Sequence, residues 1–291
     1  MVDWPGTRDS GEKESNVTTE IGGYRLEIRK VDGLAIRCVD IDDAQSSATV
    51  LMTSPWPESL LAFRRLWGTV ATHARVVAVD LPGFGHSEGR SDLFRPSAMA
   101  EFLHTLISEW GLGRPHLVAP DVGSSAALLL AARHPESVTS LVVGSGAASY
   151  PLEVSGTLAD IIAAPDIEGF RGADIRASVG STVEPVAPRA TEPQVWEDYV
   201  TSYEGGRFAE SARYVRSYPE ELRLLAGELP EITTPVLVLS AERDPLVPPS
   251  NQRFLHERLP ASKLVSFDSG HFPWEESATE YAAAIVDWIG R

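Results

Sequence analysis

Hydrophobic positions along the chain fall into short apolar runs separated by longer stretches with helical spacing. Short runs rich in β-branched residues are typical of strands buried in a parallel sheet. The runs lie at residues 48–53, 75–80, 116–119, 141–143, 235–239 and 263–267, and the helical stretches lie at 97–110, 124–132, 251–259 and 276–289. Two earlier runs, Tyr24–Val31 and Leu34–Ile41, flank Asp32-Gly33, a pair that predicts a hairpin turn. Strands that alternate with helices predict an α/β fold with a mostly parallel central sheet and helices on both faces.

The alternation breaks once, between residues 149 and 231. This stretch has no strand pattern and carries helical patches at 194–203 and 208–218. An insertion near the carboxyl ends of parallel strands lies over the crevice in which open α/β sheets bind ligands. We therefore predict a helical lid at 149–231, inserted into a core made of residues 21–148 and 232–291.

Composition narrows the range of partners. The chain has 291 residues and a formal net charge of −16. Such a surface repels nucleic-acid phosphates and anionic lipids, so we expect neither nucleic acid nor membrane as a partner. The single cysteine, Cys38, excludes an intramolecular disulfide, and residues 1–20, interpreted as a flexible tail, lack the apolar stretch of a secretory signal. We predict a cytoplasmic protein, monomeric or homodimeric. No phosphate-binding loop or metal-ligand cluster stands out, so no cofactor and no metal are expected.

The sharpest chemical signal surrounds Asp121. A predicted strand ends at Ala119. One residue separates Ala119 from Asp121, and one residue separates Asp121 from Gly123, which lies at the start of a helix. This is the strand–turn–helix context of a nucleophile elbow, usually written G-x-S-x-G, with Asp in the central position. Small residues flank such a turn because its backbone is strained. The alternative is that Asp121 only caps the following helix.

Two further residues favour the nucleophile interpretation. Asp244 follows the strand predicted at 235–239, and His271 follows the strand predicted at 263–267. The order of nucleophile, acid and histidine along the chain is that of α/β-hydrolases. Because each residue comes just after the carboxyl end of a parallel strand, all three are expected to converge at one edge of the sheet.

From about Gly22 to the end, the chain resembles the α/β-hydrolase superfamily. Residues 80–87 (DLPGFGHS) resemble the superfamily's loop after the fourth strand, and an Asp at the elbow resembles the epoxide hydrolase and haloalkane dehalogenase branch. Residues 54–57 resemble that branch's His-Gly-x-Pro segment, with Ser54 and Pro55 in place of His and Gly. The resemblance implies an oxyanion hole made by the backbone N–H groups of Trp56 and Val122, and a cis peptide bond before Pro57.

A carboxylate nucleophile restricts the chemistry. Attack on an ester would give a reactive anhydride, whereas attack on a saturated carbon with a strained or good leaving group gives a stable alkyl ester. We expect Asp121 to form such an ester with a small apolar organic substrate, and His271, oriented by Asp244, to activate the water that cleaves it. Opening an epoxide also needs a proton donor. The resemblance implies lid tyrosines, with Tyr214 as the second of them and Tyr150 or Tyr199 as the first.

Epoxide hydrolysis to a diol is the favoured prediction, and three alternatives remain open. A haloalkane dehalogenase needs N–H groups for the halide. Its branch commonly has a Trp after the nucleophile, where this chain has Val122, although the indole of Trp56 could take that role. The altered Ser54-Pro55 favours another reaction on a small natural product. The fold can also serve a non-catalytic ligand-binding protein.

Overall fold

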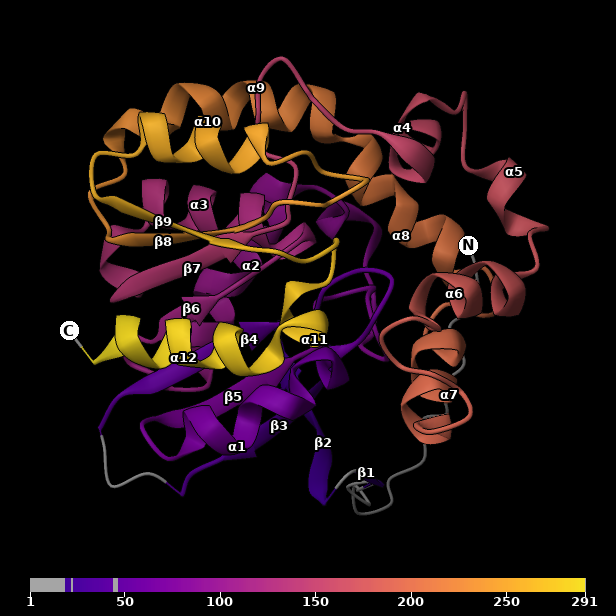
Figure 1. The fold of residues 1–291 in the computed structure, drawn as a ribbon, viewed down its shortest axis with the longest axis horizontal. Coiled ribbons are helices and arrows are strands. Elements are labelled where there is room, and N and C mark those ends of the chain that lie inside the picture. The colour runs from indigo at the N-terminus through magenta and orange to yellow at the C-terminus, as the bar shows by residue number, and fades with distance from the viewer. Residues whose placement is uncertain (1–18, 22, 44–46, 291) are drawn as a thin grey trace.

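A single mixed sheet runs through the molecule (Figure 1). The computed structural model describes residues 19–21, 23–43 and 47–290. Within these residues, nine strands lie in the order β1-β2-β3-β5-β4-β6-β7-β8-β9. The strands are β1 (Thr19–Ile21), β2 (Tyr24–Val31), β3 (Leu34–Ile41), β4 (Thr49–Thr53), β5 (Arg75–Val79), β6 (His116–Val118), β7 (Ser140–Gly144), β8 (Val236–Ala241) and β9 (Ser262–Phe267).

Strands β4 to β9 pair in parallel, and β1, β2 and β3 add an antiparallel edge. The prediction of a mostly parallel sheet is confirmed. The hairpin between β2 and β3 is also confirmed, because Asp32 and Gly33 adopt the positive φ angles of 49° and 78° that a primed turn requires. The expected tail ends earlier than predicted. Thr19 and Glu20 belong to β1, which pairs with β2, and residues 1–18 lie outside the described residues.

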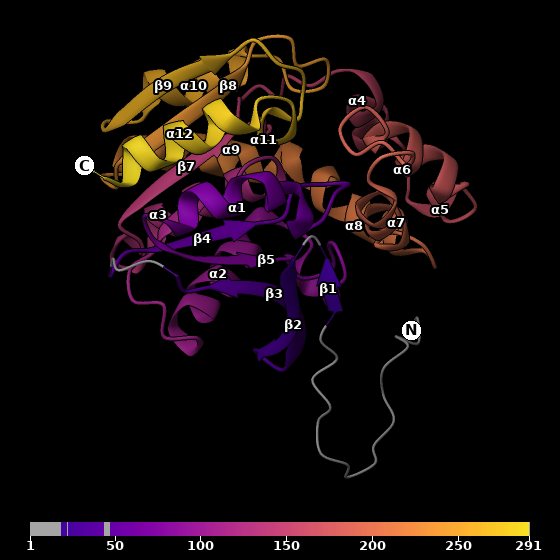
Figure 2. The ribbon, with the colours of Figure 1, turned by 60° about the horizontal axis from the view of Figure 1, so that its bottom comes forward.

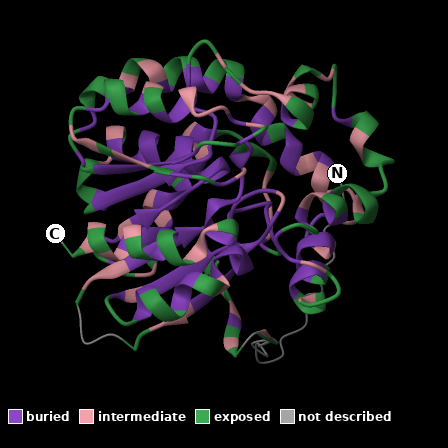
Figure 3. Cartoon of the chain, in the orientation of Figure 1, coloured by how far each residue is buried: buried purple, intermediate pink, exposed green. Residues whose placement is uncertain are grey.

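Helices cover both faces of the sheet. Helix α1 (Arg64–Ala71) packs on α12 (Ala278–Ile289) at one face, and α2 (Pro96–Glu109) packs on α3 (Val122–Arg133) at the other (Figure 2). Helix α10 (Ser250–Arg258) contacts β8 and β9, and the short α11 (Pro273–Glu276) precedes α12. Strands β4 to β8, between these layers, are almost wholly buried (Figure 3), as expected for near-continuous apolar strands. No helix in the described part of the chain is long and apolar enough to cross a bilayer.

The chain between β7 and β8 is helical in the described structure. It forms α4 (Gly156–Ala163), α5 (Glu168–Arg171), α6 (Ile175–Val183), α7 (Pro193–Thr201), α8 (Arg207–Arg216) and α9 (Tyr218–Glu228). Helices α4 to α8 lie beside one end of the sheet (Figure 1). The patches predicted at 194–203 and 208–218 correspond to α7 and α8. We call residues 149–231 the helical insertion.

A buried ion network joins the insertion to the core. Arg37 of β3 donates to the Asp80 carboxylate at 2.6 Å and, with two nitrogens, to the Asp198 carboxylate of α7 at 2.5 and 3.0 Å. Burial alone would raise the pKa of Asp198, but the charges and hydrogen bonds of Arg37 and His86 hold that pKa well below its usual value. Helix α7 is therefore fastened to the sheet by paired charges.

Replacing Arg37 tests this attachment. We expect Arg37→Met to lower the free energy of unfolding by about 3–5 kcal/mol, because it leaves two buried carboxylates without their cation. Urea denaturation measures the loss. The control is Arg90→Met, since Arg90 pairs with Asp32 and Asp92 on the surface. That change should shift the free energy of unfolding by at most about 1 kcal/mol. Equal losses in the two variants would contradict the structural role of Arg37.

Candidate active site

Asp121 stands at a strained turn between β6 and α3. Its φ of 51° is positive, a conformation that costs a non-glycine residue about 1–3 kcal/mol. The carboxylate makes no hydrogen bond that caps α3. The side chain instead points toward Trp56 and His271 and is 7% exposed. The geometry therefore differs from that of a simple helix cap.

Small residues make the turn fit. A Cβ atom at Gly146 would lie 2.4 Å from the Asp121 carbonyl oxygen, and one at Gly123 would lie 2.4 Å from Thr53 Oγ1. Hydrogen bonds hold the same turn, because the Asp121 amide donates to the Gly144 carbonyl at 2.8 Å and Ser124 Oγ donates to the Ala119 carbonyl at 3.0 Å. The strand ends and the helix start are thus locked around the carboxylate.

The segment that resembles His-Gly-x-Pro brings a donor to this carboxylate. The Trp56 amide donates to Asp121 Oδ2 at 2.6 Å, and the Trp56–Pro57 peptide bond is cis. Ser54 Oγ accepts from the Leu81 amide at 3.1 Å, which ties the segment to the loop after β5. Ser54 and Pro55 therefore leave the aim of the Trp56 N–H intact. The Val122 amide opens α3 and has no acceptor among the described residues.

His271 lies between two carboxylates. Its Nδ1 is 2.7 Å from Asp244 Oδ2, and its Nε2 is 3.7 Å from Asp121 Oδ1. The other Asp244 oxygen accepts from the amides of Leu246 and Val247 at 2.8 and 2.9 Å, which fixes its orientation. The three residues predicted from the sequence are thus brought together by three separate loops at the carboxyl edge of the sheet.

The charge state of His271 follows from these neighbours. Burial alone would lower its pKa, but the hydrogen bonds and charges of Asp121 and Asp244 outweigh burial and raise the pKa to about 10. At neutral pH the ring is therefore an imidazolium paired with Asp121. It can act as a base only after the charge on Asp121 has been removed.

A cavity of about 440 Å³ opens above Asp121 and His271, within the usual range for small-molecule sites. Trp56, Pro57 and Ala147 of the core contribute to its wall. The insertion supplies most of the remaining wall, with apolar residues Leu158, Ile161, Phe170, Ala173, Val179, Phe208 and Val215 and polar residues Thr157, Asp160, Ser178, Ser181, Thr182 and Tyr218.

The structure distinguishes between the insertion's tyrosines. The Tyr214 hydroxyl donates to the Val122 carbonyl at 2.9 Å, and Tyr214 does not line the cavity, which speaks against its predicted role as acid. Tyr150 is 44% exposed, and the Tyr199 hydroxyl donates to Glu275 at 2.8 Å. Tyr218 lines the cavity, and no described residue accepts a hydrogen bond from its hydroxyl group. Burial raises the pKa of Tyr218 well above its usual value, which keeps the hydroxyl protonated.

Two buried glutamates behind the site were not assigned a role from the sequence. Glu58 follows Pro57 and accepts from the indole N–H of Trp274 at 2.8 Å, while Glu275 binds Arg64 and Tyr199. Burial raises the pKa of both carboxyl groups, most strongly that of Glu58, which also faces the charge of Glu275. A protonated Glu58 adds no negative charge next to Asp121. The sequence signals that could have pointed to them are their positions. Glu58 directly follows Trp56-Pro57, and Glu275 comes four residues after His271.

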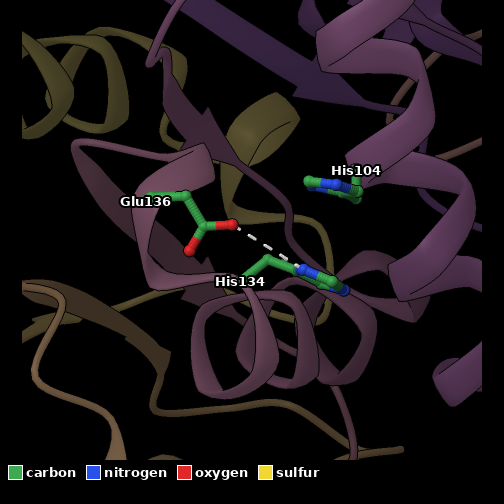
Figure 4. A group of neighbouring side chains, drawn as sticks. All are labelled: His104, His134 and Glu136. Atoms are coloured by element: carbon green, nitrogen blue, oxygen red, sulfur yellow. Dashed lines mark ion pairs between the residues drawn. The ribbon is translucent and has the colours of Figure 1, made fainter.

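One cluster of metal-ligand residue types lies elsewhere, at His104, His134 and Glu136 (Figure 4). The two imidazole rings stack with centroids 4.0 Å apart and planes 13° from parallel. An imidazole binds a metal through a lone pair in its ring plane, so two stacked rings do not direct their lone pairs at one ion. None of the three residues lines the cavity, and we assign the cluster no part in the site.

Comparison with known proteins identifies the family. The profile of the alpha/beta hydrolase fold matches residues 49–278. The chain belongs to this family. A haloalkane dehalogenase of Bradyrhizobium diazoefficiens is 26% identical over 84% of this chain and 88% of its own length. A 2-hydroxy-6-oxononadienedioate/2-hydroxy-6-oxononatrienedioate hydrolase of a Pseudomonas species is 24% identical over 75% of this chain and 77% of its own length. Other family members that match include epoxide hydrolases and methyl ester esterases.

The solved structures agree with the fold. Cfl2 of Burkholderia cenocepacia aligns over 94% of this chain and 99% of its own with a TM-score of 0.81 and 23% identity. The predicted α/β-hydrolase fold is confirmed. Because the family members that match catalyse different reactions, the reaction of this chain has to be argued from its own site.

The pairing of His271 with Asp121 generates a prediction for the histidine's titration. We expect Asp121→Asn to lower the pKa of His271 from about 10 toward or below its usual 6.5, because one of the two carboxylates that stabilise the imidazolium is lost. Nitrogen-15 NMR titration of the ring measures the shift. His116, whose pKa is lowered by burial away from this site, serves as the control.

The ion pair of His271 with Asp121 also makes the free energy of unfolding depend on pH. Because the folded-state pKa is raised, the contribution is fully present below about pH 6.5 and disappears as the pH rises through about 10. Urea denaturation across this range should show a smaller decline in Asp121→Asn than in the wild type. A His271 titration that is identical in the two proteins would refute the ion pair.

Proposed function

We propose that the protein is an epoxide hydrolase in which Asp121 is the nucleophile and the helical insertion is the lid of the active site. The observation that carries this proposal is the arrangement of the Asp121 carboxylate. Oδ2 is engaged by the Trp56 amide at 2.6 Å, and Oδ1 faces His271 at 3.7 Å beside the cavity. One oxygen is thus available to attack, and the other is already in contact with a backbone donor.

In the first step, Oδ1 attacks a carbon of the epoxide ring. A carbon–oxygen ester bond forms, the ring carbon–oxygen bond breaks, and its electron pair goes to the departing oxygen. Tyr218 donates its proton to that oxygen. The imidazolium of His271 then returns a proton to the Tyr218 phenolate, which it can do because the uncharged ester no longer stabilises its positive charge.

In the second step, neutral His271 takes a proton from a water molecule, which attacks the carboxyl carbon of Asp121. Negative charge develops on Oδ2, where the N–H groups of Trp56 and Val122 stabilise it. The intermediate then expels the alkoxide, which takes the carboxyl proton and leaves as the diol. Asp121 is again a carboxylate and His271 an imidazolium, so the cycle closes with one water consumed.

Dehalogenation is the second candidate, supported by the dehalogenase relative. The contacts favour it less. The indole N–H of Trp56 donates to Ser211 Oγ at 2.9 Å, which occupies the donor that would hold a halide. Val122 offers no side-chain N–H, whereas Tyr218 offers the proton that an epoxide needs.

The decisive experiment is an assay of wild type and Asp121→Ala against a panel of epoxides and haloalkanes. We expect diol release by the wild type and none by Asp121→Ala. His271→Gln should accumulate an ester whose mass, mapped by peptide mass spectrometry, sits on Asp121. Halide release without diol formation would move the assignment to dehalogenase. If neither diol nor halide is released and no adduct forms on Asp121, the result would favour a binding protein.

Replacing each tyrosine separates the proton donor from a packing residue. We expect Tyr218→Phe to slow ester formation by about 10²–10⁴-fold, the usual effect of losing a general acid. Tyr214→Phe is the matched control, because it removes a hydroxyl that contacts a backbone carbonyl outside the cavity. It should lower the free energy of unfolding by about 1 kcal/mol and leave ester formation little changed. Single-turnover kinetics measures both rates, and the reverse order would make Tyr214 the acid.

A further inference from the structure

The cavity wall differs in charge from what an anionic substrate would need. Among the residues that line it, the charged side chains are Asp121 and His271 at the reacting end and Asp160 of α4. No lysine or arginine in the described part of the chain lines it. Asp121 and His271 are paired with each other, so Asp160 is the charged side chain of the wall that lies outside this pair.

Asp160 is available to a ligand. The residue is exposed and lines the cavity, which places it at the mouth. No described basic side chain forms an ion pair with its carboxylate, and no described donor forms a hydrogen bond with it. Two other exposed carboxylates of the insertion, those of Glu168 and Glu197, are in contrast paired with arginines. Asp160 is thus a carboxylate on the cavity wall that has no ion-pair or hydrogen-bond partner among the described residues.

Two hydroxyl groups of α6 also favour a positively charged ligand. Ser181 and Thr182 line the cavity, and each donates its hydroxyl proton to the Ser178 carbonyl, at 3.0 and 2.9 Å. Their hydrogens are therefore committed within the helix, and their remaining lone pairs are acceptors. An ammonium group has three N–H donors and no acceptor, whereas a carboxylate has only acceptors. These two hydroxyls thus offer acceptors to an ammonium group and have no hydrogen left to donate to a carboxylate.

We infer that Asp160 is a specificity-determining residue that selects substrates carrying a protonated amine over those carrying a carboxylate. As an inference about substrate class, it rests on the proposed epoxide hydrolysis, in which the epoxide meets Asp121 while the amine remains at the mouth beside Asp160 and the α6 hydroxyls. Asp160 takes no part in bond making. It acts through the KM of charged substrates.

The test compares three epoxides on one carbon skeleton, ending in an amine, a carboxylate or a primary amide. For the wild type at low salt, we expect kcat/KM to favour the amine over the carboxylate by about tenfold, since attraction and repulsion by one partly exposed charge are each worth up to about fivefold. Asp160→Asn should reduce this ratio by about tenfold, through a higher KM for the amine and a lower KM for the carboxylate, and leave the neutral amide unchanged. Added salt should shrink the wild-type ratio.

Glu231→Gln is the matched control. It removes the same charge from an exposed position outside the cavity and should leave the ratio unchanged. A wild-type preference for the carboxylate, or a ratio that Asp160→Asn does not alter, overturns the inference.

If none of the three epoxides is converted, the proposed function fails, and binding still tests the charge preference. Calorimetry with an unreactive alkylammonium and the alkylcarboxylate of equal length should then show tighter binding of the ammonium by the wild type. Asp160→Asn should remove that difference. Equal binding of the two ions by the wild type would reject the role of Asp160 independently of turnover.

Discussion

At Asp121 the chain turns from β6 into α3 with a positive φ of 51°, and this backbone conformation dictates much of its surroundings. Gly146 must lack a side chain because its Cβ would meet the Asp121 carbonyl, and Gly123 because its Cβ would meet Thr53. In return, the carboxylate is turned away from the helix and held against the Trp56 amide. Hydrogen bonds between the turn and the parallel strands β6 and β7 prevent the Asp121 backbone from relaxing to a less strained conformation.

Buried charge is the second constraint, and the structure answers it by pairing. Asp244 is held by two backbone amides and by His271, and His271 in turn is held by Asp121. Glu58 and Glu275 lie close behind, but their raised pKa values limit the negative charge they add. His271 thus lies between two carboxylates, and an ester on Asp121 would create an imbalance by removing one of the two negative charges that stabilise the imidazolium. In the proposed reaction this imbalance is what converts the histidine from an acid into a base.

Much of this arrangement was readable from the sequence, and the failures have physical causes. The strands were found because buried parallel strands form nearly continuous apolar runs, and the Asp32-Gly33 turn because it requires positive φ angles. The convergence of Asp121, Asp244 and His271 could be predicted because each follows a strand end. Helix α1 was missed because it is only eight residues long. Tyr214 was predicted as the lid acid, and Tyr218 was not considered, because the difference depends on which way a hydroxyl points where α8 meets α9. Spacing along the chain does not encode that direction.

The helical insertion divides into a fixed part and a variable part. Helix α7 is anchored to the core through Asp198 and Tyr199, and the Tyr203 hydroxyl just beyond it donates to the Glu58 carbonyl at 2.7 Å. Helices α4 and α6 face the cavity with mixed polar and apolar residues and form no comparable buried ion pairs within the described chain. Changes in α4 and α6 therefore alter the cavity wall without disturbing the anchoring charges or the strained turn. In the proposed reaction, the core thus determines the kind of bond that Asp121 attacks, and α4 and α6 determine which molecule brings that bond to it.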